Sequence, residues 1–320
     1  MKINFSQTNL QAFENMEDYY VKIKNEITIE RNTAFDWIND IIMIILAFIM
    51  IYPLWYCVAG SLNEGMDYLR GGVFLWPRKW TLANYKAVFL DKAILNAFGI
   101  TILKCLIGTV TSLLCTAMVA YAITRPNLKL KKIYIPFIML TMFFSGGLIP
   151  YFILIVNLNL YDSFWVYIIP TMFSAYNMII IQSFMRDLSA ELIESAKLDG
   201  ASEYRIFFQI ILPLSKPVLA TIALFTVVTH WNSYFDSMMY TSSQELQTIQ
   251  LFLKKVITDP SISRGLGSAA AIAIPDQATT LTPQVVKLAT MVVTALPVVC
   301  IYPFLQRYFV KGVTMGAVKG

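Results

Sequence analysis

Charged side chains are scarce in this chain of 320 residues, because Asp, Glu, Lys and Arg together make up 14% of it. Soluble domains usually carry about a quarter. The hydrophobic share is 57%, the mean hydropathy is +0.60, and the apolar residues stand in long runs. This composition excludes a water-soluble globule and predicts an integral membrane protein. The net charge of +5 is too small to indicate nucleic-acid binding.

Histidine and paired cysteines are also scarce. With His230 as the one histidine and no Cys-x-x-Cys motif, no metal site is predicted. The four cysteines, Cys57, Cys105, Cys115 and Cys300, lie in or beside apolar runs and are predicted to be small buried hydrophobes. No Gly-Lys dipeptide occurs, so the phosphate-binding loop GxxxxGK[ST] is missing and the chain is not expected to hydrolyse ATP itself. The N-terminus has no apolar core typical of a cleavable signal peptide.

Six stretches are long and apolar enough to cross a bilayer, which takes roughly 20 helical residues. The predicted fold is an all-α membrane bundle made by the last five stretches, with the first preceding them as an arm. The stretches are Trp37–Gly60, Leu95–Thr124, Ile133–Val156, Ser163–Met185, Pro217–Tyr240 and Val285–Phe309.

The distribution of positive charge orients these spans. The short connection RPNLKLKK (125–132) is basic, whereas NLNLYD (157–162) has no cation. Because short cytoplasmic loops concentrate Lys and Arg, both termini and the loop 187–214 are predicted to be cytoplasmic. The resulting division is a cytoplasmic tail 1–36, a first span 37–60, an external segment 61–94, a core bundle 95–310 and a cytoplasmic tail 311–320.

Two external segments follow from this orientation. Segment 61–94 carries five cations, which runs against the general rule for external loops. Segment 241–284 is rich in small and turn-forming residues. It is either a contact surface for an external partner or a flexible connector.

Residues 187–214 form a charged island between two apolar spans, and they predict two short helices. Ser189 and Ser202 are placed to cap the helix starts, and Gly200 can close the first helix in the left-handed conformation. Pro213 is expected to stop the second helix, and Pro217 suits the first turn of the next span. Tyr204, Phe207, Phe208 and Ile211 recur at helical spacing as one apolar stripe. Such a pair either lies passively at the membrane interface or docks into a soluble cytoplasmic partner.

The island resembles a known motif. Glu194-Ser195-Ala196, then Asp199-Gly200-Ala201, then Ile210-x-Leu212-Pro213 resembles the EAA loop of type I ABC importer permeases, with serine for alanine at position 195. Further stretches are similar to the oligosaccharide-uptake permeases of that family. They are IYPLWYCVAGSLN (51–63), FSGGLIPYFIL (144–154), HWNSYFDSMMY (230–240) and YPFLQRYFVKGVTMGAVKG (302–320).

This resemblance implies a transport subunit of the bacterial inner membrane and not an enzyme. Its substrate class would be an oligosaccharide or a modified sugar, acidic sugars included. The implied partners are a second related permease, two ATPase subunits that bind the ATP and Mg²⁺, and an external sugar-binding protein; no cofactor is expected in this chain. The coupling residues would be Glu194, Ser195, Ala196, Asp199, Gly200, Ala201, Tyr204, Phe207 and Phe208. The alternatives are a carrier or channel that does not depend on ATP, or a membrane scaffold that recruits a soluble protein.

Candidate substrate residues lie around the single histidine. Sugars are bound by aromatic faces and by polar groups that pair with hydroxyls, and Trp231, Asn232 and Asp236 supply both kinds. Alternatively, Trp231, Tyr234 and Tyr240 form an aromatic belt at the membrane interface, and Asn232 bonds a neighbouring helix. His230 is expected to be a packing residue whose polar atoms are satisfied.

Two further features of the spans leave alternatives open. Lys104 stands inside the second span, where an isolated cation costs about 3 kcal/mol. It either snorkels to the interface or attracts an acidic sugar, in which case Lys104→Met would impair transport of acidic sugars and spare neutral ones. Ser145-Gly146-Gly147 allows either close helix packing or a hinge.

Overall fold

The computed structural model describes residues 34–273 and 281–317, and side-chain surroundings within 34–269 and 281–301. These residues are helical apart from turns and an isolated antiparallel bridge between Asn63 and Trp80. The prediction of an all-α fold is confirmed. The chain divides into two compact units, residues 1–55 and 56–320.

Helix α2 (Ala34–Ser61) is the predicted first span and crosses the boundary between the two units. It is uninterrupted, although Pro53 lies inside it. In the first unit its apolar side chains, among them Trp37, Ile44 and Ile51, are exposed, as expected for residues that contact lipid.

Two more helices of the described chain can cross a membrane alone, and three bent pairs can do so together. The single helices are α5 (Lys92–Thr124) and the Pro283–Ile301 part of α16 (Pro283–Ala317). With one span for each bent pair, the described residues offer up to six spans, in agreement with the predicted number. The pairs are α6 (Lys131–Phe143) with α7 (Leu148–Asn157), bent by 115°; η1 (Phe164–Tyr167) and η2 (Ile169–Thr171) with α8 (Ala175–Arg186), bent by 47°; and Glu203–Leu214 with α12 (Lys216–Asn232), bent by 79°.

The Ser145-Gly146-Gly147 sequence lies at the sharpest of these bends. Gly147 precedes α7 with a φ of +86°, in the region that L-residues rarely adopt, and this explains why glycine suits the break. A Cβ added at Gly146 or Gly147 would meet nothing within 4 Å. Close helix packing is therefore the wrong alternative within the described chain, and the hinge stays a prediction.

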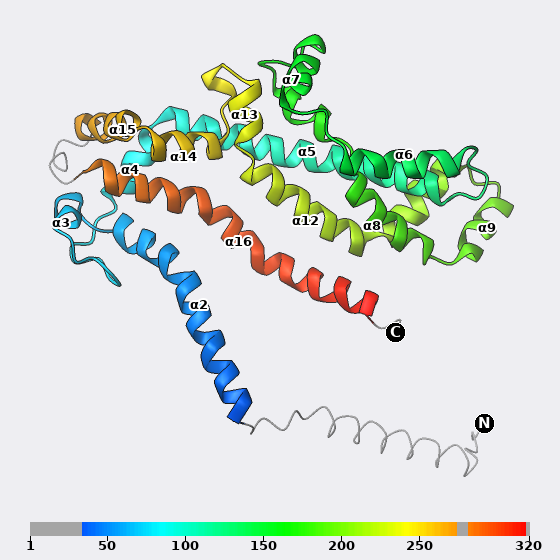
Figure 1. The fold of residues 1–320 in the computed structure, drawn as a ribbon, viewed down its shortest axis with the longest axis horizontal. Helices are drawn as coiled ribbons and strands as arrows, with labels where there is room; N and C mark the ends of the chain where they lie inside the picture. Colours follow the sequence, from blue (N-terminus) through cyan, green and yellow to red (C-terminus); the bar gives the residue numbers. More distant parts are fainter. Residues whose placement is uncertain (1–33, 274–280, 318–320) are drawn as a thin grey trace, which may run out of the picture. The chain divides into compact units, whose positions relative to one another are not determined.

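Helix α5 is the central helix of the second unit. Figure 1 shows α8 and α12 beside it, and α16 packs against α12. One apolar cluster surrounds the amino-terminal half of α5 and includes Ile94, Ala97, Trp231, Val286 and Ala289. Another surrounds its carboxyl end and includes Ala117, Tyr121, Ile181, Phe207 and Ile222.

Polar side chains hold together the segment 61–94 after α2, which contains α3 (Gly65–Leu69) and α4 (Ala83–Leu90). Asn84 is fully buried and donates to the carbonyls of Ser61 (2.7 Å) and Asn63 (2.9 Å). Arg78 pairs with Asp67 at 3.0 Å. Hydrogen bonds from Asn63 and Arg78 lower the pKa of the Asp67 carboxyl. Arg78, one of the cations of this segment, therefore has a structural role.

The segment 241–284 is folded where the structure describes it. Tyr240 ends α13 (Phe235–Tyr240), and η4 (Gln244–Leu246), α14 (Ile249–Thr258) and α15 (Pro260–Ala273) follow. Buried side chains of α14 and α15, including Phe252 and Leu266, join the cluster at the amino-terminal half of α5. The prediction of a flexible connector is therefore wrong for the described part; residues 274–280 lie outside it.

Asp162 fastens this segment to the turn after α7. Its carboxylate accepts hydrogen bonds from the backbone N–H groups of Ser242 and Ser243, both at 2.9 Å, and from the Ser243 hydroxyl at 2.6 Å. These bonds favour the charged form, and they lower the pKa of Asp162 from its ordinary value of 3.8 to about 2.

The depressed pKa predicts a loss of thermal stability in acid. The Asp162 contribution is complete above pH 3.8, its unfolded value, and is lost as the pH falls toward 2. Asp162→Asn should lower the melting temperature at neutral pH and should flatten the slope between these two pH values. Melting curves of both proteins across that range test this, and parallel acid slopes would contradict it.

Candidate functional site

The island 187–214 folds as two helical stretches joined at a glycine. Helix α9 (Ala190–Leu198) ends two residues before Gly200, which has a φ of +75° and donates its N–H to the Lys197 carbonyl at 3.0 Å. Ala201 donates to the Ala196 carbonyl, also at 3.0 Å. The predicted left-handed glycine is confirmed, and both hydrogen bonds fix the direction in which the chain leaves α9.

The cap and stop predictions had mixed outcomes. Ser202 caps α10 (Glu203–Ile206) by accepting from the Arg205 N–H at 3.3 Å, as predicted. Ser189 occupies the N-cap position of α9, but its side chain makes no capping bond. The second helical stretch ends at Leu214 in α11 (Leu212–Leu214), one residue after Pro213, so the predicted stop is confirmed. The chain bends by 79° at Ser215, before α12 begins.

A π-helical stretch divides the predicted apolar stripe. Between α10 and α11 the chain forms η3 (Phe207–Ile211). Phe207 and Ile211 are buried, whereas Tyr204 is 73% and Phe208 48% exposed. Uniform α-helical spacing would have kept all four on one face; the wider π turn changes their directions.

The exposed side of the island carries large apolar side chains. Leu192 is 49% and Leu198 89% exposed, and Tyr204 and Phe208 add to them. Glu194 is also exposed. Sequence reasoning missed Leu198, although an apolar residue directly before the helix-ending Asp199-Gly200 was a usable signal. Exposed apolar side chains of this kind mark a surface that contacts either a protein or the membrane.

The buried side of the island is joined to the carboxyl end of α5. The Phe207 ring packs against Tyr121 with centroids 5.3 Å apart. The Tyr121 hydroxyl donates to Glu203 at 2.6 Å, and Lys197 pairs with the same carboxylate at 2.7 Å. The second helical stretch of the island is therefore in direct contact with α5, and the Lys197 ion pair joins α9 to that stretch.

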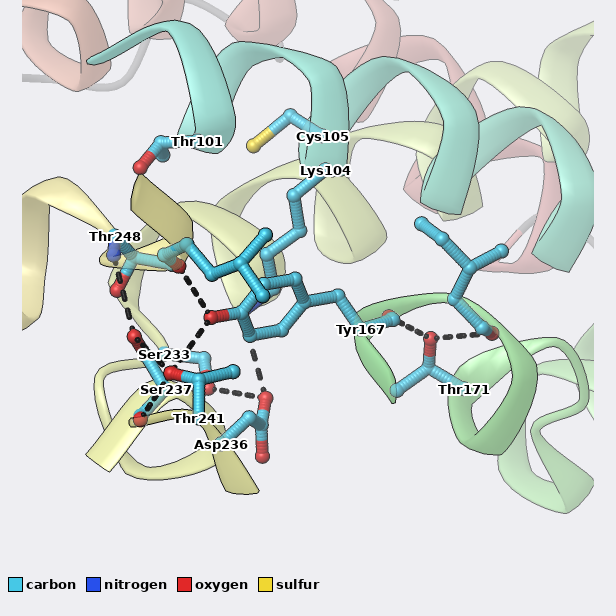
Figure 2. A network of polar contacts seen from close by, with 12 residues as sticks. Thr101, Lys104, Cys105, Tyr167, Thr171, Ser233, Asp236, Ser237, Thr241 and Thr248 are labelled. Atoms are coloured by element: carbon cyan, nitrogen blue, oxygen red, sulfur yellow. Dashed lines mark hydrogen bonds and ion pairs between the residues drawn. The ribbon is translucent and has the colours of Figure 1, made fainter. Parts of the chain in front are cut away.

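A buried ion pair lies far from the island along α5 (Figure 2). Lys104, whose side chain is fully enclosed, is 3.4 Å from Asp236 between Nζ and Oδ2. Its Nζ also lies over the Tyr167 ring, 4.8 Å from the centroid. Figure 2 shows these three side chains, from α5, η1 and α13, directed toward one another. Lys104 therefore does not snorkel; it lies at a junction of three elements.

Hydroxyl groups surround this pair. Ser233 donates to Asp236 at 2.6 Å, and Tyr167 donates to the Leu246 carbonyl at 2.6 Å. The Ser237 oxygen accepts from the Thr248 N–H at 3.2 Å. Asp236 keeps 30% of its side chain exposed, so the network is open to solvent on the carboxylate side and closed on the ammonium side.

The remaining substrate candidates separate into buried and exposed residues. Trp231 is buried, donates Nε1–H to the Thr294 carbonyl at 3.2 Å and packs near Phe98, while Asn232 is exposed at the end of α12. The aromatic-belt alternative is wrong for Trp231 and Tyr240, which are both buried. Asn232 and Asp236 therefore present polar atoms to solvent, while Trp231 and Lys104 do not.

His230 is a packing residue at the crossing of α5 and α12. It is 4% exposed, and its Nε2 atom has no hydrogen-bond partner among the described protein atoms, so the expectation that its polar atoms are satisfied is not met. A Cβ added at Gly108 would lie 2.7 Å from that atom. Glycine at position 108 thus lets the imidazole fit between the helices.

Gly108→Ala is expected to lower the free energy of unfolding by about 1–3 kcal/mol, because the enclosed imidazole cannot move away from the new methyl group. Gly99→Ala is the matched control: it lies on the same helix, its added Cβ meets nothing within 4 Å, and helix propensity favours alanine by about 1 kcal/mol. Thermal unfolding in detergent measures both.

In a His230→Ala background the same Gly108→Ala change should cost little, since the clash is gone. Equal losses in both backgrounds would contradict the proposed contact. Elsewhere in the described residues, no three His, Cys, Asp or Glu side chains group in a way that could hold a metal ion.

A helical bundle with a charged helix–glycine–helix loop between two candidate spans is the arrangement expected of a permease subunit. The chain belongs to the family described as "Binding-protein-dependent transport system inner membrane component", which matches residues 108–315. It is similar to Protein LplC of Bacillus subtilis (strain 168), with 35% identity over 90% of this chain and 95% of the relative.

Two other similarities concern named transport systems. The polygalacturonan/rhamnogalacturonan transport system permease protein YtcP of Bacillus subtilis (strain 168) is 33% identical over 91% of this chain and 100% of the relative. A crystal structure of a bacterial ABC transporter involved in the import of the acidic polysaccharide alginate has a chain that matches with a TM-score of 0.80 and 30% identity. The match covers 86% of this chain and 96% of that one. The resemblance to ABC importer permeases for sugars is thus confirmed.

Proposed function

We propose that this chain is the permease subunit of an ATP-driven importer for carboxylate-bearing oligosaccharides. A second related permease would complete the path, two separate ATPase subunits would bind ATP and Mg²⁺, and an external binding protein would deliver the sugar. The island and both termini would face the cytoplasm, as the basic connection 125–132 suggests. Transport would proceed by alternating access.

The observation that carries this proposal is the two-sided structure of the island. Its exposed side offers Leu192, Leu198, Tyr204 and Phe208 to a partner. Its buried side contacts α5 through Phe207 and Glu203. A loop that only lay at the membrane surface would need the first feature but not the second. This arrangement supports the transfer of motion from an ATPase into the bundle.

The acidic nature of the substrate is proposed from the relatives. One relative is named for the transport of polygalacturonan and rhamnogalacturonan, and the structural neighbour is involved in the import of the acidic polysaccharide alginate. On this chain, Asn232 and the half-open Asp236 are proposed to contact sugar hydroxyls. Lys104 and Trp231 would not touch the sugar. Lys104 would hold Asp236 through the ion pair, and the buried Trp231 would fix the position of its neighbour Asn232.

The test is uptake by proteoliposomes that contain the purified transporter and its binding protein. Oligogalacturonate should enter only when ATP is present on the ATPase side, and a neutral oligosaccharide of equal length should enter more slowly. ATP-dependent uptake with the opposite preference would leave the importer in place and contradict the acidic substrate.

The same preparation separates the alternative functions. Sugar entry without nucleotide would identify a carrier or a channel. If a soluble protein co-purifies with the chain but no sugar uptake occurs with or without ATP, the chain is a scaffold.

A further inference from the structure

We propose that a cavity at the carboxyl end of α5 binds an anionic phospholipid of the surrounding membrane. The cavity has a volume of about 440 Å³ and lies between α5, the basic connection and the second helix of the island. Met118, Ala122 and Leu128 form its apolar wall. Arg125, Asn127 and Glu203 form its polar end. The combination of an apolar wall and a polar end matches a lipid, which has an acyl chain and a headgroup.

The apolar wall continues an uncovered face of α5. Leu106, Val110, Leu114 and Met118 follow one another at intervals of four residues, and each is at least 37% exposed. Residues four apart lie on one side of a helix, so these four side chains form one apolar strip. The strip ends at Met118 in the cavity wall, and an acyl chain can lie along it. This face is about 18 Å long at the helical rise of 1.5 Å per residue, a little over half of the roughly 30 Å hydrocarbon layer.

The polar end carries an excess of positive charge. Arg125 forms no ion pair within the described chain, and the Glu203 carboxylate beside it is already paired with Lys197 at 2.7 Å. Arg125 and Lys197 against Glu203 leave one positive charge. Lys129, Lys131 and Lys132 follow in the connection, which has no carboxylate.

The Arg125 guanidinium is held in place but keeps free donors. It lies 4.4 Å from the Tyr121 ring centroid, and it donates through Nε (3.3 Å) and Nη2 (3.0 Å) to the Thr124 hydroxyl. A guanidinium has five N–H groups, so three remain for a phosphate. The change from apolar to basic residues at the end of a span also marks the depth at which headgroups lie.

A lipid in this cavity would contact the bundle and the island together. Glu203, Tyr204 and Phe207 line the cavity from the island side, and Met118 and Ala122 line it from α5. Occupancy would therefore hold the island against α5. This adds a membrane-lipid dependence to the coupling movement, whichever sugar is transported.

Native mass spectrometry of the assembled transporter, released from nanodiscs of phosphatidylcholine with or without phosphatidylglycerol, tests the site. The wild type should retain phosphatidylglycerol in preference to phosphatidylcholine. Arg125→Gln should reduce this preference about fivefold, the factor that corresponds to about 1 kcal/mol for one basic residue near an anionic surface. Arg125→Lys keeps the charge and should keep most of the preference.

A second variant fills the cavity without touching the charge. Met118→Trp should remove the retained phosphatidylglycerol, whereas Met139→Trp, at an exposed methionine of α6, should not. A photo-activatable residue at position 118 should form an adduct with a lipid. An adduct with a protein chain, equal retention of both lipids by the wild type, or unchanged retention in Arg125→Gln would each overturn the proposal.

Discussion

Gly200→Pro is expected to abolish ATP-driven uptake while the protein remains in the membrane in its normal amount. Gly200 has a φ of +75°, whereas the proline ring fixes φ near −65°. Proline would also remove the N–H that donates to the Lys197 carbonyl, and it favours an extended residue before it, whereas Asp199 has φ −75° and ψ 6°. The turn between α9 and α10 would be lost, at a cost of about 3 kcal/mol.

The loss should stay local, because Gly200 is exposed and a Cβ there would meet nothing within 4 Å. Gly200→Asn is the matched control, since asparagine tolerates positive φ better than other residues with a side chain. It should retain most of the uptake, and Gly200→Ala should be intermediate. Uptake and ATPase rates in proteoliposomes, with the membrane amount of each variant, provide the measurement. Normal uptake by Gly200→Pro would show that the island does not couple the two activities.

Breaking the Lys104–Asp236 pair is expected to have the largest effect on stability, and the two single changes should differ. Asp236→Leu leaves the fully enclosed Lys104 ammonium without its carboxylate, which should cost about 3–5 kcal/mol. Lys104→Met leaves a carboxylate that is 30% exposed and still accepts a hydrogen bond from Ser233, so its cost should be smaller. The double variant should recover part of the loss, because an apolar pair replaces two opposite charges.

Thermal unfolding of the wild type, the two single variants and the double variant in one detergent forms a double-mutant cycle. Lys86→Met, at an exposed lysine, is the control for loss of charge. Additive losses would mean that the two side chains do not interact. If Lys104→Met proved worse than Asp236→Leu, the ammonium would be the hydrated partner, contrary to its burial.

The same pair changes the expected effect of Lys104 on substrate choice. A cation that faced the path would favour acidic sugars, so its loss would spare neutral ones. In this structure the Lys104 side chain is enclosed and its charge is opposed by Asp236. Lys104→Met is therefore expected to reduce uptake of acidic and neutral oligosaccharides alike. A selective loss of acidic sugars would indicate that the pair opens in another state of the transport cycle.

Local backbone rules were predictable in the island because they depend on neighbouring residues. The left-handed Gly200, the Ser202 cap and the early Pro217 of α12 follow from such rules. The stop near Pro213 was predictable too, because the helical stretch ends at Leu214, but the π-helical turn η3 before it was not. That turn reverses the exposure of half of the apolar stripe, and spacing alone carries no sign of it.

Long-range partners were not predictable from the sequence. Lys104 was seen as a costly cation inside a span and Asp236 as a candidate sugar contact, and 132 positions separate them along the chain. Trp231 was placed at an interface or in the path, and packing against Phe98 and α16 buries it instead. In each case the number of plausible neighbours is large, and only folding selects one.

The sequence by itself determined the membrane class, up to six spans, the absence of a phosphate-binding loop and the place of the charged island, because length, hydropathy and motif spacing act along the chain. The tertiary structure decided which island residues face outward, which charges neutralise each other and where α5 carries a cavity. Those features depend on helix rotation and on contacts between distant segments. One residue more or less per turn, as in η3, is enough to change them.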